Sequence, residues 1–207
     1  MKKIFLIIAI FILIFSVVCI IGTNNTAFKI VVEQRKNIFD NNELIRKEKN
    51  NNFQIIHSVA QVNDANDTAY CIDIVKKTLL GYKWIYGGSH IDKFIPFNSR
   101  DFNISAQLLN HKEYPKLIIF GICMNKNIES INVKVHGDYK EAKIYYGLSK
   151  DERYYVVNFD KEKVYDNYFI FEITYLNGNI ETFVIEDENI ESFQEGKAKY
   201  LYSDKIR

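Results

Sequence analysis

The chain is poor in proline and cysteine, with 2 Pro and 3 Cys among 207 residues. Little proline combined with an aromatic content of 14% favours β-strands over disorder. A basic excess is lacking as well, because 27 Lys and Arg stand against 26 Asp and Glu, for a net charge of +1. Nucleic-acid-binding proteins normally carry such an excess to displace phosphate counterions, so we expect no nucleic-acid partner.

Metal-binding and catalytic motifs are also missing. No two histidines lie two to five residues apart and no cysteine lies close to one, which excludes a local zinc signature; the histidines are His57, His90, His111 and His136. Residues 64–67 resemble the start of a calcium loop, but Ala69 and Val75 occupy the places of its glycine and glutamate. Ser89 lacks the second glycine of a nucleophile elbow, because Ile91 stands there. We therefore expect no cofactor and no metal, and leave enzymatic activity open.

A long apolar segment is present from Ile4 to Gly22. It carries no charge, its only polar side chains are Ser16 and Cys19, and it has no polar stripe that would mark a soluble helix. About 20 such residues suffice for a helix to cross a hydrocarbon core. The segment therefore predicts a transmembrane helix that contacts membrane lipid through residues 4–22.

Two other fates stay open for this segment. A cleaved secretory signal would leave the protein secreted, but its apolar core is shorter, at roughly 7–15 residues. A lipidated cysteine would follow a small residue, whereas Cys19 follows Val18.

The orientation of the segment is predicted from the lysines before it. Because Lys2 and Lys3 directly precede the apolar run, we expect a signal-anchor in the cytoplasmic membrane with the body outside. Basic residues also follow the run, at Lys29, Arg35 and Lys36, and these oppose that orientation.

Residues 23–52 predict a short helical stalk and linker. Apolar residues recur there at steps of three and four between charged ones, beginning with Phe28, Val31 and Val32. The polar run at 47–52 indicates a solvated linker. Sustained heptads are missing, which argues against a coiled-coil stalk.

From Phe53 onward, short apolar runs alternate with turn residues, as expected of β-strands. The expected strands cover residues 54–62, 68–75, 82–86, 103–109, 117–124, 130–135, 142–146, 154–159, 168–176 and 179–185. The clearest hairpin signal is Asn177 followed by Gly178, since a tight turn of this kind needs positive φ at both positions.

These patterns predict a mainly β protein, built as an antiparallel sandwich or open barrel of about ten short strands. The predicted parts are a transmembrane helix at 1–22, the stalk and linker at 23–52, an extracytoplasmic β domain at 53–190 and a C-terminal tail at 191–207.

A row of aromatic residues lies between glycines at 81–88. In a regular strand Tyr82, Trp84 and Tyr86 would project from one face and, with His90, could stack on a sugar or a peptide. The alternative is that this row packs in the core, as aromatic side chains commonly do.

The body contains two cysteines, Cys71 and Cys123. If the body lies outside the cell, they could form one disulfide. The alternative is a pair of buried free thiols, because cysteine also packs as a small apolar residue.

Two stretches, residues 79–88 (LLGYKWIYGG) and 120–133 (FGICMNKNIESINV), resemble segments of small uncharacterised envelope proteins of Gram-positive bacteria. The resemblance covers roughly residues 53–185 and implies a membrane-anchored location and a β-rich body. It implies no activity. It also implies an aliphatic residue at the position of Cys123, which weighs against the disulfide.

The leading hypothesis is a non-catalytic interaction module on the outer face of the cytoplasmic membrane, whose ligand is a protein, an envelope polymer or a toxin. One rival is an envelope hydrolase with catalytic residues scattered along the chain, which would gather Asp, Glu or His side chains in one pocket. The other rival is a structural subunit of a membrane complex.

Overall fold

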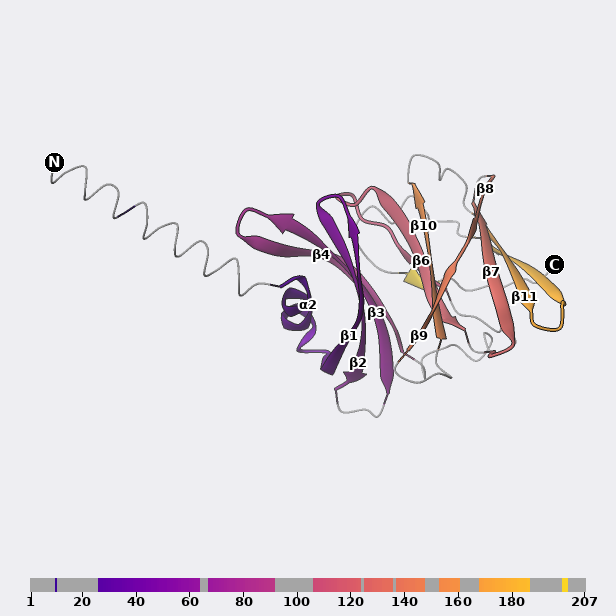
Figure 1. The fold of residues 1–207 in the computed structure, drawn as a ribbon, viewed down its shortest axis with the longest axis horizontal. Helices are drawn as coiled ribbons and strands as arrows, with labels where there is room; N and C mark the ends of the chain where they lie inside the picture. The colour runs from indigo at the N-terminus through magenta and orange to yellow at the C-terminus, as the bar shows by residue number, and fades with distance from the viewer. Residues whose placement is uncertain are drawn as a thin grey trace.

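The computed structural model describes residues 10, 26–63, 67–91, 106–123, 125–135, 137–147, 153–160, 168–186 and 199–200. Within these ranges a short helix covers the first of three antiparallel sheets, and the sheets stack face to face (Figure 1). The predicted mainly β, antiparallel class is therefore confirmed.

The first sheet, called sheet A, is a meander in which each strand pairs with the next along the chain. Helix α2 (Ala27–Arg35) precedes it and packs on its outer face. Its strands, in the order β1-β2-β3-β4, are β1 (Phe39–Asn50), β2 (Phe53–Val62), β3 (Thr68–Thr78) and β4 (Gly81–Ile91).

The remaining strands form two further sheets. Sheet B has the order β13-β5-β6-β10-β9, with β5 (Gln107–Leu109), β6 (Lys116–Cys123), β9 (Lys143–Tyr146), β10 (Arg153–Asp160) and β13 (Lys199–Tyr200). Sheet C has the order β12-β11-β7-β8, with β7 (Ile128–Val135), β8 (Asp138–Glu141), β11 (Tyr168–Tyr175) and β12 (Ile180–Glu186).

Sheet B is the middle layer and is buried on both faces. Ile118 and Phe120 of β6 pack against sheet A, while Leu117 and Ile119, which point the other way, pack against sheet C. This explains why β6 is a continuous apolar run instead of an alternating one. The described strands thus form a stack of three sheets, whereas the prediction was a sandwich or an open barrel.

Each of the expected strands has a counterpart in the structure, but the segment before them differs from its prediction. The helical spacing of the proposed stalk is realised only over 27–35, and α2 lies on sheet A instead of standing apart from the body. The polar residues expected to form a linker belong to β1, which pairs along its length with β2, and to the turn at Asn51 and Asn52. An edge strand with wet faces has no apolar pattern to reveal it.

The hairpin at Gly178 lies where it was predicted, with a different turn. Of Asn177 and Gly178, only Gly178 has positive φ (82°), and its N–H donates to the Tyr175 carbonyl at 2.8 Å. The loop spans residues 176–178 between Tyr175 and Asn179, whose backbones are hydrogen-bonded at 2.9 Å. This is the three-residue loop with a left-handed glycine, not the two-residue turn.

The predicted membrane segment, apart from Ile10, lies outside the described residues, as do Asp64 and Asn66 of the calcium-like run and His136. Among the residues that are described, no helix is both long and apolar enough to span a bilayer. Of the predicted C-terminal tail the structure describes Lys199 and Tyr200, which pair with β5.

The two cysteines of the body do not form a disulfide. Cys71 is a free thiol under α2, and Cys123 is a free thiol between sheets B and C. Sheet B therefore separates them. Burial raises the pKa of both thiols to about 12, as expected of unreactive cysteines.

A buried ion pair fastens α2 to sheet A. The Arg35 Nε donates to both carboxylate oxygens of Asp73 at 2.9 Å, and its Nη2 donates to the Gly88 carbonyl at 3.0 Å. The indole N–H of Trp84 donates to Asp73 Oδ1 at 2.8 Å. Asp73 is 0% exposed, so its charge is balanced by these donors alone among described groups.

Replacing Asp73 with alanine leaves Arg35 buried without its counter-charge, and we expect the free energy of unfolding to fall by about 3–5 kcal/mol. Urea unfolding of the detergent-solubilised chain measures this. Asp160→Ala, which removes an exposed partner of Lys116 at 4.0 Å, is the matched control and should cost less than about 1 kcal/mol. Equal losses in the two variants would show that the buried pair does not hold the helix.

Candidate functional site

The aromatic row of β4 does not form one surface. A bulge shifts the register so that Tyr86 pairs with Ile74 and Trp84 with Val75, which leaves Ile85 as the extra residue. Tyr82 and Trp84 therefore pack under α2, whereas Tyr86 packs towards sheet B. The sequence cannot show this bulge, because a regular strand and a bulged strand have the same residues.

The contacts of these aromatic residues are internal. Trp84 bonds to Asp73, and the Tyr82 hydroxyl accepts from Gln54 Nε2 at 2.9 Å. Tyr86 stacks on the ring of His111 with 5.5 Å between ring centroids, and burial raises the pKa of its hydroxyl. His90 lies on β4 opposite Tyr70, but its side chain is outside the described part of the chain.

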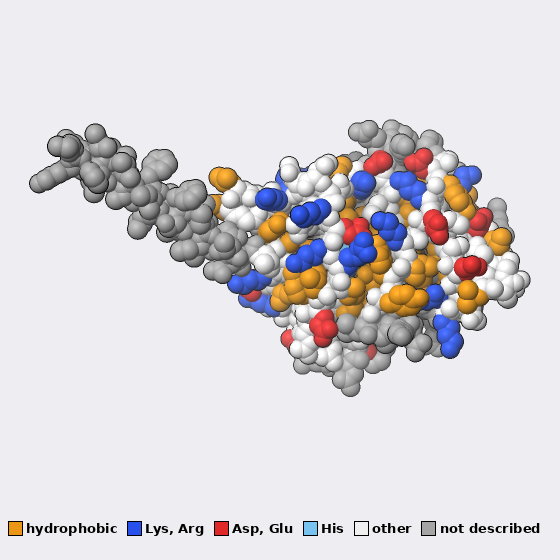
Figure 2. All heavy atoms as spheres, viewed as in Figure 1, with side chains coloured by type: hydrophobic (Ala, Val, Ile, Leu, Met, Phe, Trp, Pro, Cys, Tyr) orange, Lys and Arg blue, Asp and Glu red, His pale blue; other side chains and the backbone are white. Residues whose placement is uncertain are grey.

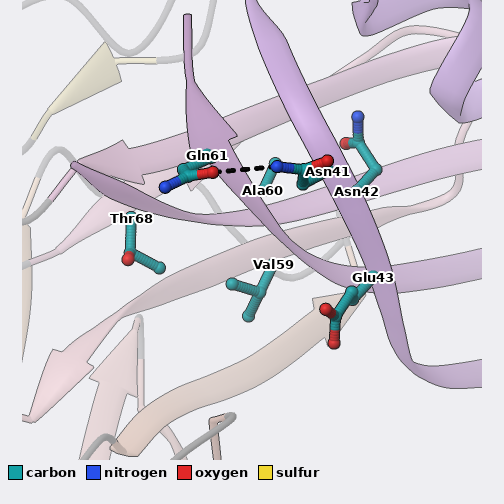
Figure 3. Close-up of a pocket in the computed structure, with 7 residues that line it drawn as sticks. All are labelled: Asn41, Asn42, Glu43, Val59, Ala60, Gln61 and Thr68. Carbon is teal, nitrogen blue, oxygen red and sulfur yellow. Dashed lines mark hydrogen bonds between the residues drawn. The ribbon is translucent and has the colours of Figure 1, made fainter. Parts of the chain in front are cut away.

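An opening lies instead beside β1, near the start of that strand. In β1, Asp40 pairs with Gln61 and Glu43 with Val59, so two residues of β1, Asn41 and Asn42, stand against the single residue between them in β2. This bulge opens a cavity of about 470 Å³ (Figure 3). It is lined by Asn41, Asn42, Glu43, Val59, Ala60, Gln61 and Thr68.

Three amide side chains give this amide pocket its chemistry. Asn41 Nδ2 donates to Gln61 Oε1 at 2.9 Å across the bulge, the contact drawn in Figure 3. Asn42 Nδ2 donates to the Phe39 carbonyl at 3.4 Å, while Asn42 Oδ1 is buried without a hydrogen-bond partner. Asn41 adopts φ 46°, a conformation that asparagine tolerates better than most residues. Bulges are over-represented at sheet edges and next to active sites, so the amide pocket is a candidate binding site.

A second polar group lies deep between sheets A and B. His57 is 1% exposed, its ring lies 5.5 Å from that of Tyr145 and 6.0 Å from that of Tyr154, and neither ring nitrogen has a hydrogen-bond partner. Glu48 Oε1 lies 3.9 Å from His57 Nε2 and accepts from the Tyr145 hydroxyl at 2.6 Å.

Burial determines the protonation of this histidine. It lowers the pKa of His57 from 6.5 to about 4, although Glu48 opposes the change, so the imidazole is neutral at pH 7. Burial acts against ionisation of Glu48, but the Tyr145 hydroxyl and nearby cations outweigh it and lower its pKa.

A histidine and a carboxylate this close could serve a hydrolase, but neither lines the amide pocket. In the described ranges, no group of three or more His, Cys, Asp or Glu side chains could hold a metal ion.

Comparison of the chain with protein-family models, with curated proteins and with solved structures finds no match. The site must therefore be interpreted from its own geometry. Neither the amide pocket nor His57 was singled out from the sequence. The two adjacent asparagines at 41 and 42 are the one local signal for the bulge, since asparagine tolerates positive φ.

The burial of His57 makes stability depend on pH. Because the unfolded chain binds a proton at about pH 6.5 and the folded chain only near pH 4, stability is complete above 6.5 and falls as pH decreases towards 4. The full shift corresponds to about 3 kcal/mol. Urea midpoints measured between these pH values should fall more steeply for the natural chain than for His57→Gln. Glu48 is present in both chains, and because its pKa is lowered from 4.5 it contributes mainly at the acid end of this range. Parallel pH profiles would contradict the prediction.

Proposed function

We propose that the protein is a membrane-anchored, extracytoplasmic and non-catalytic binding module, which takes a polypeptide segment in the amide pocket. The apolar run at 4–22 and the resemblance to envelope proteins support the location. The observation that carries the binding role is the β1 bulge with its amide-lined cavity.

The lining favours a peptide over a glycan. Each amide side chain offers both a donor and an acceptor, as the peptide group does, while Val59 and Ala60 add small apolar surface. Among the described residues no aromatic ring lines this cavity, so they offer no stacking surface for a sugar. The described lining also contains no lysine or arginine, and therefore no cation for an anionic polymer.

The location is tested by protease accessibility. A protease added to intact cells should degrade the body, because the anchor holds it on the outer face, and immunoblotting of the body reports the loss. A cytoplasmic enzyme blotted in parallel must stay intact. A body that survives in intact cells and is degraded only after lysis would reverse the proposed orientation.

The binding role is tested by crosslinking in those cells. A photoreactive amino acid placed at Glu43, an exposed residue at the pocket, should form an adduct with a protein. Gln61→Ala should weaken the adduct about tenfold, since each lost hydrogen bond is worth roughly 1 kcal/mol and the substitution also frees Asn41.

The matched control is Gln54→Ala, which removes a glutamine of the same strand that bonds to Tyr82 outside the pocket. Equal adduct formation in the two variants would contradict binding in the pocket. An adduct that is digested by glycan hydrolases would identify an envelope polymer instead. If the protein still associates stably with membrane proteins after the pocket is lost, it is a structural subunit of a membrane complex.

A further inference from the structure

The turn between β3 and β4 presents two leucines to solvent. Leu79 is 94% exposed and Leu80 is 53% exposed, and both stand at the end of a long hairpin. Gly81, with φ 121°, allows the chain to reverse directly after them. A leucine pair this exposed gains little burial and therefore adds little to the stability of the body.

Lysines surround these leucines. Lys76, Lys77 and Lys83 flank the turn within eight residues of sequence, and residues 76–83 are called the basic tip here. Glu113 opposes this charge in part, because it pairs with Lys76 at 3.2 Å and with Lys83 at 4.0 Å. Exposed apolar residues within a basic surface are typical of segments that enter the headgroup region of an anionic membrane.

The start of α2 lies at the same end of the body. Ala27 and Phe28, in the first turn of the helix, share an apolar cluster with Tyr82 of the basic tip, whereas Arg35 at the other helix end bonds to Gly88. Figure 1 shows the β3–β4 turn at that end and the β11–β12 turn at the opposite end. Figure 2 shows basic side chains gathered over the part of the body formed by sheet A.

Chain length limits how far the tip can lie from the membrane. The apolar run ends at Gly22 and the helix cap is Thr26, so the connection spans at most about 14 Å. The tip is thus placed near the surface of any bilayer that holds the segment.

We infer that the basic tip is a second membrane contact, which inserts Leu79 and Leu80 between the headgroups of an anionic bilayer. This inference rests on the anchor of the proposed function. A lipid surface explains the paired leucines and their lysine flanks together, and the short connection to Thr26 brings it within reach. Anchor and tip together restrict the orientation of the body more than the anchor alone would.

The orientation has a consequence for the amide pocket. Thr68 of the pocket and Thr78 beside the tip are the two ends of β3, about 30 Å apart. The pocket is therefore held away from the bilayer, where it can be reached by a partner from the aqueous side.

Fluorophores at two exposed leucines test this contact. Leu79→Cys and Leu176→Cys, each in a Cys19→Ser background, are labelled with an environment-sensitive dye; Cys71 and Cys123 are buried and stay unlabelled. Leu176, 66% exposed in the β11–β12 turn, is the matched control. The full chains are reconstituted in nanodiscs of phosphatidylcholine with about 30% phosphatidylglycerol.

At position 79 we expect quenching by nitroxide-labelled lipids and at least about twofold protection from aqueous iodide, with neither effect at position 176. Equal iodide quenching at both positions, in protein that still co-elutes with the discs, would overturn the contact and leave the anchor standing. Protein that does not co-elute would overturn the anchor and the inference together.

A charge reversal tests the anionic surface. Lys77→Glu with Lys83→Glu should reduce lipid quenching at position 79 by about half or more, while Lys134→Glu, an exposed lysine of sheet C, should not. Unchanged quenching in the double variant, or in discs without phosphatidylglycerol, would overturn the requirement for anionic lipid.

Discussion

The ion pair between Arg35 and Asp73 is the constraint on which the arrangement of this protein depends. A charge at a fully buried carboxylate is tolerated only where its oxygens are occupied, and here Arg35 and Trp84 supply the donors. The ion pair also requires a glycine at position 87, since a Cβ there would lie 2.1 Å from Asp73 Oδ1 and 2.8 Å from Arg35 Nη2. Helix α2 can therefore dock in one position along sheet A. An apolar contact alone would permit sliding, because apolar contacts have little directional preference.

The helix fixed by this ion pair is connected to both ends of sheet A. Its last turn leads directly into β1, whose first residues form the bulge of the amide pocket, while its first turn lies beside the basic tip. Because neighbouring strands of sheet A are antiparallel, the turns at 51–52 and 79–80 lie at one end of the sheet, and Asn63 and Asp67 lie at the other. Sheet B then covers the second face of sheet A, with His57 and its tyrosine neighbours in the interface.

The sequence predicted the strands whose positions depend on burial. It did not predict the features that depend on the register between paired strands. The expected strands of sheet B were found because burial on two faces requires long apolar runs, as in β6, and β7 of sheet C shows the alternation of a strand with one buried face. Strand β1 was missed because an edge strand with charged, wet faces resembles a linker. Both errors at the site come from bulges: one separated Tyr86 from Trp84, and the other created a pocket from two asparagines. A bulge depends on how two strands pair, and the residues of one strand alone do not reveal that pairing.

The two bulges have different surroundings, and the difference explains the cavity at the β1 bulge. The bulge in β4 lies between α2 and sheet B, so neighbouring layers fill the space on both sides and turn its aromatic residues into packing. The bulge in β1 lies on an edge strand, where no further strand pairs with the displaced backbone. Its displaced residues are asparagines, whose amides can be satisfied by one another, by water or by a ligand. Asn42 Oδ1 has no hydrogen-bond partner among the described residues, whereas Asn41 and Gln61 bond to each other across the bulge.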